Sequence, residues 1–262
     1  MLNIEQIQNY FPPQIRENPA HTKYILKEYI QLLILDFLAV SKFVKKVTFI
    51  GGTNLRLVKG IDRFSEDLDF DCKDFSAEDF NEMSQSVLTF LQRAGLRVEI
   101  REKESEKLSA FRARIFFPEL LFEFGLSAYK EERFLIKLES QNQEFEYQPK
   151  VANINHCGFF IFFPVPPDDI LCAMKLSALL SRAKGRDFYD AMFLLAQTQP
   201  NYDYLTQKHN ISNFSELKTK LIKLTENVDL VQKSKDFEHL LFNKVNGERV
   251  LHFNEFVKNI NL

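Results

Sequence analysis

The hydrophobic pattern of the sequence changes once, at the prolines Pro164, Pro166 and Pro167. Before them, short apolar or alternating runs indicate β-strands with few helices between them. After them, apolar residues recur at helical spacing. Strands that are not regularly separated by helices predict a mixed sheet with helices on it, not a doubly wound fold. We therefore expect an α/β (α+β) protein with a mixed-sheet core in residues 1–165 and an all-helical part in residues 166–262.

The individual elements follow from the same patterns and from their boundary residues. In the first part we expect a helix over 22–43, a helix that begins at the N-cap Ser76 and ends near Gly95, and strands at 47–50, 67–72, 96–100, 111–117, 134–138 and 159–163. In the second part we expect helices over 168–183, 187–197, 213–225, 228–242 and 247–259. The 27 phenylalanines, with no tryptophan, are expected to fill the core.

Charge and length exclude several protein classes. The 262 residues carry 34 Lys and Arg against 36 Asp and Glu, a net charge of −2. This near-neutral sum excludes a general nucleic-acid coat protein but leaves room for local basic patches. Such patches are expected at Arg182, Lys184 and Arg186 and in the segment 97–114. The most apolar stretch, 25–40, is interrupted by charges and too short to span a membrane, so we expect a buried helix there.

The cysteines and histidines indicate a reducing compartment and no zinc site. Cys72, Cys157 and Cys172 are an odd number without a C-x-x-C pair, which makes a poor disulfide framework. The five histidines are scattered, without metal-ligand spacing. The first ten residues are polar and do not resemble a signal peptide. We therefore expect a cytoplasmic protein without a membrane segment.

The strongest local pattern is the acidic strand around Asp67, Asp69 and Asp71. Alternate residues of a strand share a face, so the three carboxylates are expected to lie together. They repel one another unless a cation lies among them, and Mg²⁺ takes such oxygen ligands together with substrate phosphates. Carboxylates that hold metal suit displacement at phosphorus. The alternative is an exposed strand whose outer face is acidic without a function.

A glycine pair precedes this strand. The strand at 47–50 runs into Gly51-Gly52, and Thr53 then begins a short expected helix. Glycines here let backbone N–H groups approach a phosphate closely, although a tight turn needs glycine for steric reasons alone. The loop is not a Walker motif, because the lysine of that motif is missing. Arg63 and Ser65, just before the acidic strand, can reach the same phosphates or occupy a surface turn.

Glu139 is the candidate for a third carboxylate. At the end of the expected strand 134–138, Leu135, Lys137 and Glu139 share one face. If this strand lies beside the acidic strand, Glu139 can serve as a metal ligand or as a general base. A solvent-facing pair of Lys137 and Glu139 at a strand end is equally compatible with the spacing.

Lys175 is the only charged residue between Ile170 and Leu180, in an otherwise apolar helix. Such a helix is buried, and a buried ammonium group needs an anion because its removal from water is costly. The anion can be a carboxylate of the protein, which gives Lys175 a structural role, or a substrate phosphate. The side chain can also extend to solvent.

Two acidic residues follow in the segment 186–190, which has the sequence R-D-F-Y-D. On a helix, Asp187 and Asp190 share a face, and Arg186 reaches Asp190 four residues later. An acidic first turn of the helix accounts for Asp187. Asp190 stands directly before a very apolar run and is harder to explain as a surface residue.

Together these motifs resemble those of the AbiEii/AbiGii-type, MenT-like nucleotidyltransferase toxins. That family carries a G-G/S-T-x-L-R motif and an R-x-S-x-D-L-D-F strand, which residues 51–56 and 63–70 match. It then has a lysine on a helix and an R-D-x-x-D motif, which correspond to Lys175 and residues 186–190. The D-x-D part is shared with the wider polymerase-β-like nucleotidyltransferase superfamily. The resemblance spans roughly residues 45–195.

The resemblance implies an enzyme that transfers a nucleoside monophosphate from an NTP to an acceptor, with Mg²⁺ or Mn²⁺ and loss of pyrophosphate. Asp67 and Asp69 would bind the metal, with Glu139 as the expected third ligand. The triphosphate would be held by Gly51, Gly52, Thr53, Ser65 and Lys175, with Arg63 and Arg186 counted among the nucleotide-binding residues. Asp190 and Asp187 would be essential acidic residues. The helical part, residues 166–262, would therefore contribute Lys175 and Asp190 to the active site.

Acceptor and partners are also implied by the resemblance alone. In related toxins the acceptor is the 3′ end of tRNA, whose modification blocks translation, and a cognate antitoxin is encoded nearby. Three alternatives stay open: transfer to a small molecule or a protein, a catalytically silent binding module on the same scaffold, and a metal nuclease. The nuclease is disfavoured, because nucleases of the D…E-x-K kind need an order that Lys137-Leu138-Glu139 reverses.

Overall fold

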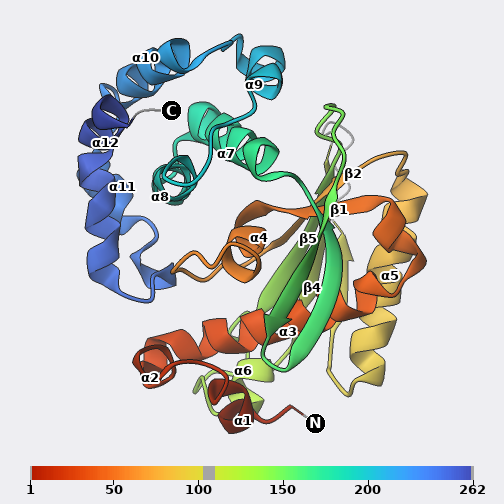
Figure 1. Ribbon diagram of the computed structural model, residues 1–262. Coiled ribbons are helices and arrows are strands. Elements are labelled where there is room, and N and C mark those ends of the chain that lie inside the picture. The colour runs from red at the N-terminus through yellow and green to blue at the C-terminus, as the bar shows by residue number, and fades with distance from the viewer. Residues whose placement is uncertain (1, 103–109, 261–262) are drawn as a thin grey trace. The chain divides into compact units, whose positions relative to one another are not determined.

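The computed structural model describes residues 2–102 and 110–260, and the chain divides into two compact units (Figure 1). They are the sheet unit (Met1–Gly60, Phe64–Glu144, Pro149–Val165) and the helical unit (Ile61–Arg63, Phe145–Gln148, Pro166–Leu262). The expected boundary at residue 165 would place Ile61–Arg63 in the first part of the chain. In the structure these three residues belong to the helical unit. Within the expected basic segment 97–114, Lys103 and Lys107 lie outside the described residues.

The sheet unit is built on a five-stranded mixed sheet. Its strands are β1 (Val47–Ile50), β2 (Leu68–Cys72), β3 (Glu99–Glu102), β4 (Ala110–Phe116) and β5 (Leu135–Gln141), in the order β1-β2-β5-β4-β3. β2 and β5 are parallel, and the other neighbours are antiparallel. The expected mixed sheet is therefore confirmed, because parallel and antiparallel pairs occur in one sheet.

The two faces of this sheet differ in chemistry. Phe49, Phe70 and Leu138 are fully buried on one face, and helix α5 (Ala77–Arg93) packs against β3 and β4. Alternation along the strands places Asp69 and Glu139 on the opposite face, where both are partly exposed. The carboxylates of Asp69 and Glu139 therefore point away from this core.

Further elements complete the sheet unit. α3 (Thr22–Ala39) packs on α5 and on strand β7 (Phe159–Val165), which pairs with β6 (Lys150–His156) in a two-stranded sheet. The remaining helices are α1 (Ile4–Gln8), α2 (Pro13–Arg16), α4 (Gly51–Leu57) and α6 (Leu120–Glu123), with 3₁₀ turns at Pro19–His21 and Lys42–Lys45. The sequence pattern does not predict β6, because its exposed positions include the polar Asn153 and Asn155 and its buried side is short.

The helical unit contains six α-helices within its described residues: α7 (Asp168–Arg182), α8 (Gly185–Leu195), α9 (Tyr202–His209), α10 (Phe214–Thr225), α11 (Leu230–Lys235) and α12 (Phe253–Asn259). 3₁₀ turns occupy Glu238–Leu240 and Lys244–His252. The expected helix 228–242 is therefore α11 followed by a 3₁₀ turn, and the first half of the expected helix 247–259 is 3₁₀. Apolar spacing alone does not separate α-helices from short 3₁₀ segments.

Phenylalanine side chains fill the core of each unit, as expected. Ring contacts join Phe49, Phe70 and Phe163 in the sheet unit and Phe188 and Phe253 in the helical unit. Phe160 and Phe162 of β7 are exceptions, since both are exposed. None of the helices that the structure describes has the length and apolar character needed to cross a bilayer.

Candidate active site

The acidic strand and Glu139 lie side by side in the sheet. Asp69 is in register with Ile50 of β1 and with Glu139 of the parallel strand β5. Register partners on neighbouring strands point to the same face, so both carboxylates stand on the face that is not packed against the core. Asp67 directly precedes β2, and 18 % of its side chain is exposed. The expectation for Glu139 required a strand beside the acidic one, and β5 is that strand.

Two carboxylates of this face have a basic neighbour. Lys137 Nζ lies 3.2 Å from Asp67 Oδ2, and Arg112 Nε lies 3.4 Å from Glu139 Oε1. Because each ionised carboxylate accepts about four hydrogen bonds and these side chains are partly exposed, further ligands can still bind. Lys137 and Glu139 therefore do not pair with each other. Lys137 contacts Asp67, and Glu139 contacts Arg112.

Asp71 shares this face by register but has a different environment. It is 2 % exposed, and its Oδ1 accepts the backbone N–H of Gln143 at 2.9 Å. A carboxylate held in this way fixes the chain that follows β5. Asp67 and Asp69 therefore remain as the acidic pair on the accessible part of the face.

Gly51 is required both by its own backbone and by Asp69. Its φ of +83° lies in the left-handed region that favours glycine. A Cβ atom at this position would lie 2.0 Å from Asp69 Oδ2. The start of α4 therefore packs directly against the acidic strand. Thr53 strengthens the link, because its hydroxyl donates to the backbone carbonyl of Asp67.

Ser65 and Arg63, which precede the acidic strand, are not part of a surface turn. Ser65 is 7 % exposed, and its carbonyl accepts a hydrogen bond from Gln31 Nε2 at 3.3 Å. Arg63 is 1 % exposed. The surface-turn alternative is therefore wrong for both residues, and the burial of a guanidinium requires a partner of opposite charge.

The donor set of the sheet face fits a hard divalent cation in part. Asp67, Asp69 and Glu139 are oxygen donors of the kind that Mg²⁺ prefers. However, no group of three or more Asp, Glu, His or Cys side chains that could hold a metal occurs among residues 2–102 and 110–260. The three carboxylates by themselves thus do not form a ready-made metal site, and the role of Glu139 as a third ligand stays a prediction. Mg²⁺ is commonly bound through one or two carboxylates, with substrate phosphates and waters as the other ligands.

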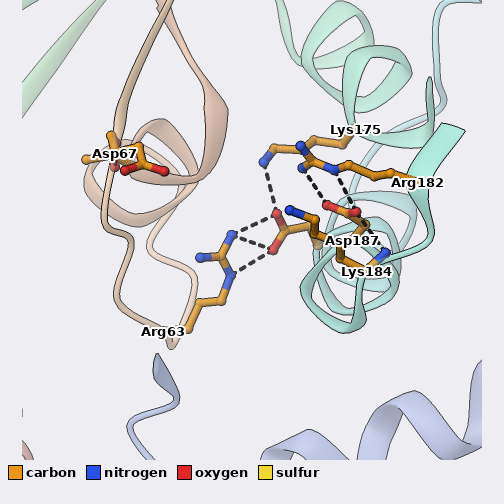
Figure 2. Close-up of polar contacts among 8 residues, drawn as sticks. Arg63, Asp67, Lys175, Arg182, Lys184 and Asp187 are labelled. Carbon is orange, nitrogen blue, oxygen red and sulfur yellow. Dashed lines mark hydrogen bonds and ion pairs between the residues drawn. The ribbon is translucent and has the colours of Figure 1, made fainter. Parts of the chain in front are cut away.

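Asp190 is the centre of a buried charge cluster in the helical unit, and Figure 2 labels its partners Arg63 and Lys175. Arg63 donates Nε to Oδ1 at 2.8 Å and Nη2 to Oδ2 at 2.7 Å, and Lys175 Nζ donates to Oδ2 at 2.9 Å. The side chains of Asp190 and Lys175 are 1 % and 10 % exposed. Burial by itself raises the pKa of Asp190, but Arg63 and Lys175 outweigh it and hold that pKa below its usual range.

This cluster decides several alternatives that the spacing left open. Lys175 contacts a carboxylate of the protein and is largely buried. The alternative that its side chain extends to solvent is therefore wrong. Arg63 was expected to reach phosphates, but its guanidinium binds Asp190. Arg186 was expected to pair with Asp190, whose two oxygens are instead bound by Arg63 and Lys175. The planar fork of the Arg63 guanidinium matches both oxygens of the Asp190 carboxylate.

Asp187 caps the start of α8. Its Oδ2 accepts the backbone N–H of Lys184 at 3.1 Å, and Arg182 donates to both carboxylate oxygens at 2.9 and 2.8 Å (Figure 2). A carboxylate in the first turn also interacts favourably with the helix dipole. The structural explanation that the sequence offered for Asp187 therefore accounts for its contacts.

A second set of contacts fixes the segment Ile61–Arg63 within the helical unit. The Tyr189 hydroxyl donates to Asp62 Oδ1 at 2.7 Å, and Asn246 Nδ2 donates to Asp62 Oδ2 at 2.6 Å. Burial, with the hydrogen bond to Asp62, raises the pKa of Tyr189, so the hydroxyl stays protonated and donates. Consecutive residues of α8, Tyr189 and Asp190, thus hold the consecutive residues Asp62 and Arg63.

A third charge cluster, which the sequence patterns did not single out, surrounds Glu28 of α3. Arg56 donates Nε to Oε2 at 2.9 Å and Nη2 to Oε1 at 3.0 Å, and His156 Nε2 lies 2.7 Å from Oε1. Burial raises the pKa of Glu28, but Arg56 and His156 hold it below its usual range. Arg56 lies in α4, so this cluster anchors the glycine motif to α3. The available signal was an acidic residue in an apolar helix, the same kind of signal that singled out Lys175.

Known proteins share this fold. Residues 33–242 match the family model described as nucleotidyl transferase AbiEii toxin, type IV TA system. The chain is similar to the structure of MenT4, a nucleotidyltransferase toxin from Mycobacterium tuberculosis H37Rv, with 17% identity and a TM-score of 0.63 over 100% of this chain and 91% of that one. It is also similar to JHP933 from Helicobacter pylori, with 20% identity and a TM-score of 0.55 over 90% of each chain. No curated protein shows a significant match.

Proposed function

Because the chain belongs to the AbiEii nucleotidyltransferase toxin family of type IV toxin–antitoxin systems, we propose that it transfers a nucleoside monophosphate from an NTP to RNA. The proposed metal is Mg²⁺ or Mn²⁺, and the proposed acceptor is the 3′ end of tRNA. The observation that carries the proposal is the register of Asp69 with Glu139, with Gly51 packed against Asp69. It joins the acidic strand, the third carboxylate and the glycine turn in one part of the sheet unit.

The sheet unit provides the charged groups for the transfer in this proposal. Asp67 and Asp69 hold the metal, which would neutralise charge on the triphosphate and the leaving pyrophosphate. Glu139 either completes the ligands or accepts the proton of the attacking hydroxyl. The acceptor oxygen forms a bond to the α-phosphorus while the bond from that phosphorus to pyrophosphate breaks. Gly51, Gly52, Thr53 and Ser65 are the proposed neighbours of the triphosphate.

The helical unit contributes Lys175 in this proposal. One N–H of its ammonium group donates to Asp190 at 2.9 Å, and two further N–H groups are left for phosphate oxygens. Asp190 then acts through Lys175, because it holds the ammonium group in one place. Asp187 acts through the start of α8, which it caps. Arg63 makes no phosphate contact in this proposal, because its guanidinium binds Asp190.

The proposed reaction would account for toxicity. A nucleotide added to the 3′ end of tRNA blocks translation, and a cognate antitoxin, which we expect to be encoded nearby, would counteract this effect. NTPs and tRNA are cytoplasmic, so we propose the cytoplasm as the site of action. The three cysteines Cys72, Cys157 and Cys172 are free and buried, which suits a reducing compartment.

Transfer of label from α-³²P-NTP to total RNA tests the proposal. We expect wild-type protein with Mg²⁺ to label RNA of tRNA size, and we expect Asp67→Asn and Lys175→Met to lose the labelling and the toxicity. Asp36→Asn is the matched control, because Asp36 is an exposed aspartate on α3 outside the site. Circular dichroism of each variant separates loss of chemistry from loss of folding.

The distribution of the label distinguishes the possible acceptors. Label in protein or small metabolites, with none in RNA, would replace the RNA acceptor by one of those classes. Full transfer by both Asp67→Asn and Lys175→Met would show that the assigned residues do not form the site. Transfer of label to RNA in a reaction that contains EDTA, and therefore no free divalent cation, would contradict the metal dependence.

A further inference from the structure

The face of the sheet that carries the acidic strand also carries arginines to which the proposed chemistry gives no role. Arg112 and Arg114 of β4 are exposed, whereas Ala113 and Ile115 are fully buried on the other face. Alternation along the strand therefore places both arginines on the same face as Glu139.

Strand register sets the order of charges across this face. Arg112 is opposite Glu139, and Arg114 is opposite Lys137, whose ammonium group lies 3.2 Å from Asp67. Neighbouring strands are about 4.8 Å apart, so Arg114 lies about 10 Å from the acidic strand, with Lys137 between them. We call Lys137, Arg112 and Arg114 the basic row.

Within the basic row, Lys137 and Arg112 have a carboxylate beside them, whereas Arg114 faces a like charge. Like charges directly opposite on neighbouring strands repel each other, and Arg114 has Lys137 opposite it on β5. With the residues that the structure describes, Arg114 forms no ion pair. An external anion would remove this repulsion and use the paired donors of the guanidinium group.

We propose that the basic row binds the phosphodiester backbone of the acceptor RNA and directs its 3′ end towards Asp67 and Asp69. This inference rests on the proposed RNA acceptor. The row ends at the carboxylates where the acceptor hydroxyl reacts, so the nucleotides next to the reacting end lie over β5 and β4. The other face of the sheet is filled by buried side chains and α5. Arginine suits this contact because its planar donors match phosphate oxygens.

RNA binding without NTP tests the inference separately from catalysis. The probe is a fluorescent single-stranded RNA of about 12 nucleotides, within the range that such sites cover, and its anisotropy is measured over a series of salt concentrations. We expect Arg114→Gln to bind about tenfold more weakly at low salt, the loss of one charge-assisted hydrogen-bonded contact. The slope of log K against log salt should fall in magnitude by about 0.7, the value for one phosphate on a single strand.

Two further variants control for charge and position. Arg93→Gln removes the same charge from an exposed position on α5 and should leave affinity and slope unchanged. Arg114→Lys keeps the charge and should retain the slope. Calorimetric titration with Mg-NTP should give the same affinity for Arg114→Gln as for wild type, because the basic row contacts the acceptor.

The outcomes separate this inference from the proposed function. Equal RNA affinity and salt slope for wild type, Arg114→Gln and Arg93→Gln would overturn the inference even if RNA is labelled. Unchanged RNA binding with loss of antitoxin binding in Arg114→Gln would also overturn it, since the row would then dock a protein. Weaker RNA binding by Arg114→Gln alone, with no transfer of label to RNA by wild type, would support the RNA surface and refute the proposed function.

Discussion

Two aspartates that the sequence presents as site candidates, Asp190 and Asp67, have opposite environments. Asp190 is 1 % exposed, and its two oxygens are bound by Arg63 and Lys175. Asp67 is 18 % exposed and has Lys137 at 3.2 Å. A buried carboxylate that is already bound by basic side chains fixes the positions of those side chains. A partly exposed carboxylate can still accept a new ligand. The difference separates a positioning residue from a candidate metal ligand.

Glu28 of the sheet unit belongs with Asp190 in this comparison. Each is a buried carboxylate bound by both ends of an arginine fork and by one further basic side chain. Each joins segments that are far apart in the chain: Glu28 joins α3 to Arg56 and His156, and Asp190 joins α8 to Arg63. Their loss should therefore be felt in stability, and the loss of Asp67 should not.

The largest effect is expected for Asp190→Ala. The change leaves Arg63 and Lys175 buried without a counter-charge, which should lower the free energy of unfolding by about 3–5 kcal/mol. Urea unfolding followed by circular dichroism measures this loss. Asp36→Ala, at an exposed position of α3, is the control with no expected change. If the free energy of unfolding falls by less than about 1 kcal/mol, the range of surface ion pairs, the cluster is not a major source of the stability of the helical unit.

A somewhat smaller loss is expected for Glu28→Gln. The neutral side chain keeps hydrogen-bonding capacity, and the side chains of Arg56 and His156 are 13 % and 24 % exposed. We expect the free energy of unfolding to fall by about 2–3 kcal/mol, at the low end for a broken buried pair. The same urea experiment measures it. A larger loss than for Asp190→Ala would reverse the ranking of the two clusters.

Gly51→Ala tests the contact between the glycine motif and the acidic strand. Gly60 is the matched control, because its φ is +75° and a Cβ there has no neighbour within 4 Å. The backbone alone costs about 1 kcal/mol at either position. Gly51→Ala adds the clash with Asp69, so a total of about 2 kcal/mol and weaker Mn²⁺ binding by calorimetry are expected. Equal losses for both variants would mean that Asp69 moves aside freely.

Acid should weaken both buried clusters. The pKa values of Asp190 and Glu28 are lowered in the folded protein. Their stabilisation is therefore fully present above the unfolded pKa values of about 4. It is lost as the pH falls through the lower folded values. Unfolding measured from pH 6 to pH 2, about the range concerned, should show a shallower loss for Glu28→Gln than for wild type. Identical slopes would exclude Glu28 as a source of the acid sensitivity.

The smallest effect on stability is expected for Asp67→Asn. It removes one partly exposed ion pair with Lys137, which should change the free energy of unfolding by less than about 1 kcal/mol. Nucleotidyl transfer should nevertheless be lost, because the variant lacks a proposed metal ligand. Thermal unfolding and label transfer on one preparation measure both. A large loss of stability would show that Asp67, like Asp190, mainly stabilises the fold.

Local pattern was sufficient for the parts of the fold that depend on neighbours in sequence. The alternation of Leu68 and Phe70 with aspartates predicted which side of β2 faces the core, although Asp71 on the other side is buried as well. The prolines near residue 165 predicted the change from strands to helices. The apolar surroundings of Lys175 predicted that its helix is buried, which the structure confirms. These properties follow from backbone geometry and hydrophobic burial, which repeat every two or 3.6 residues and so leave a local trace.

Only the tertiary structure decided the partners of the buried charges. Asp190 could have bound Arg186 one turn away, but Arg63, 127 residues earlier in the chain, binds it. Glu28 looked like an interruption of an apolar helix, yet it holds Arg56 and His156. A buried charge takes whichever partner the packed chain brings within about 3 Å with the right geometry. That choice depends on how distant segments pack, and no spacing in the sequence records it.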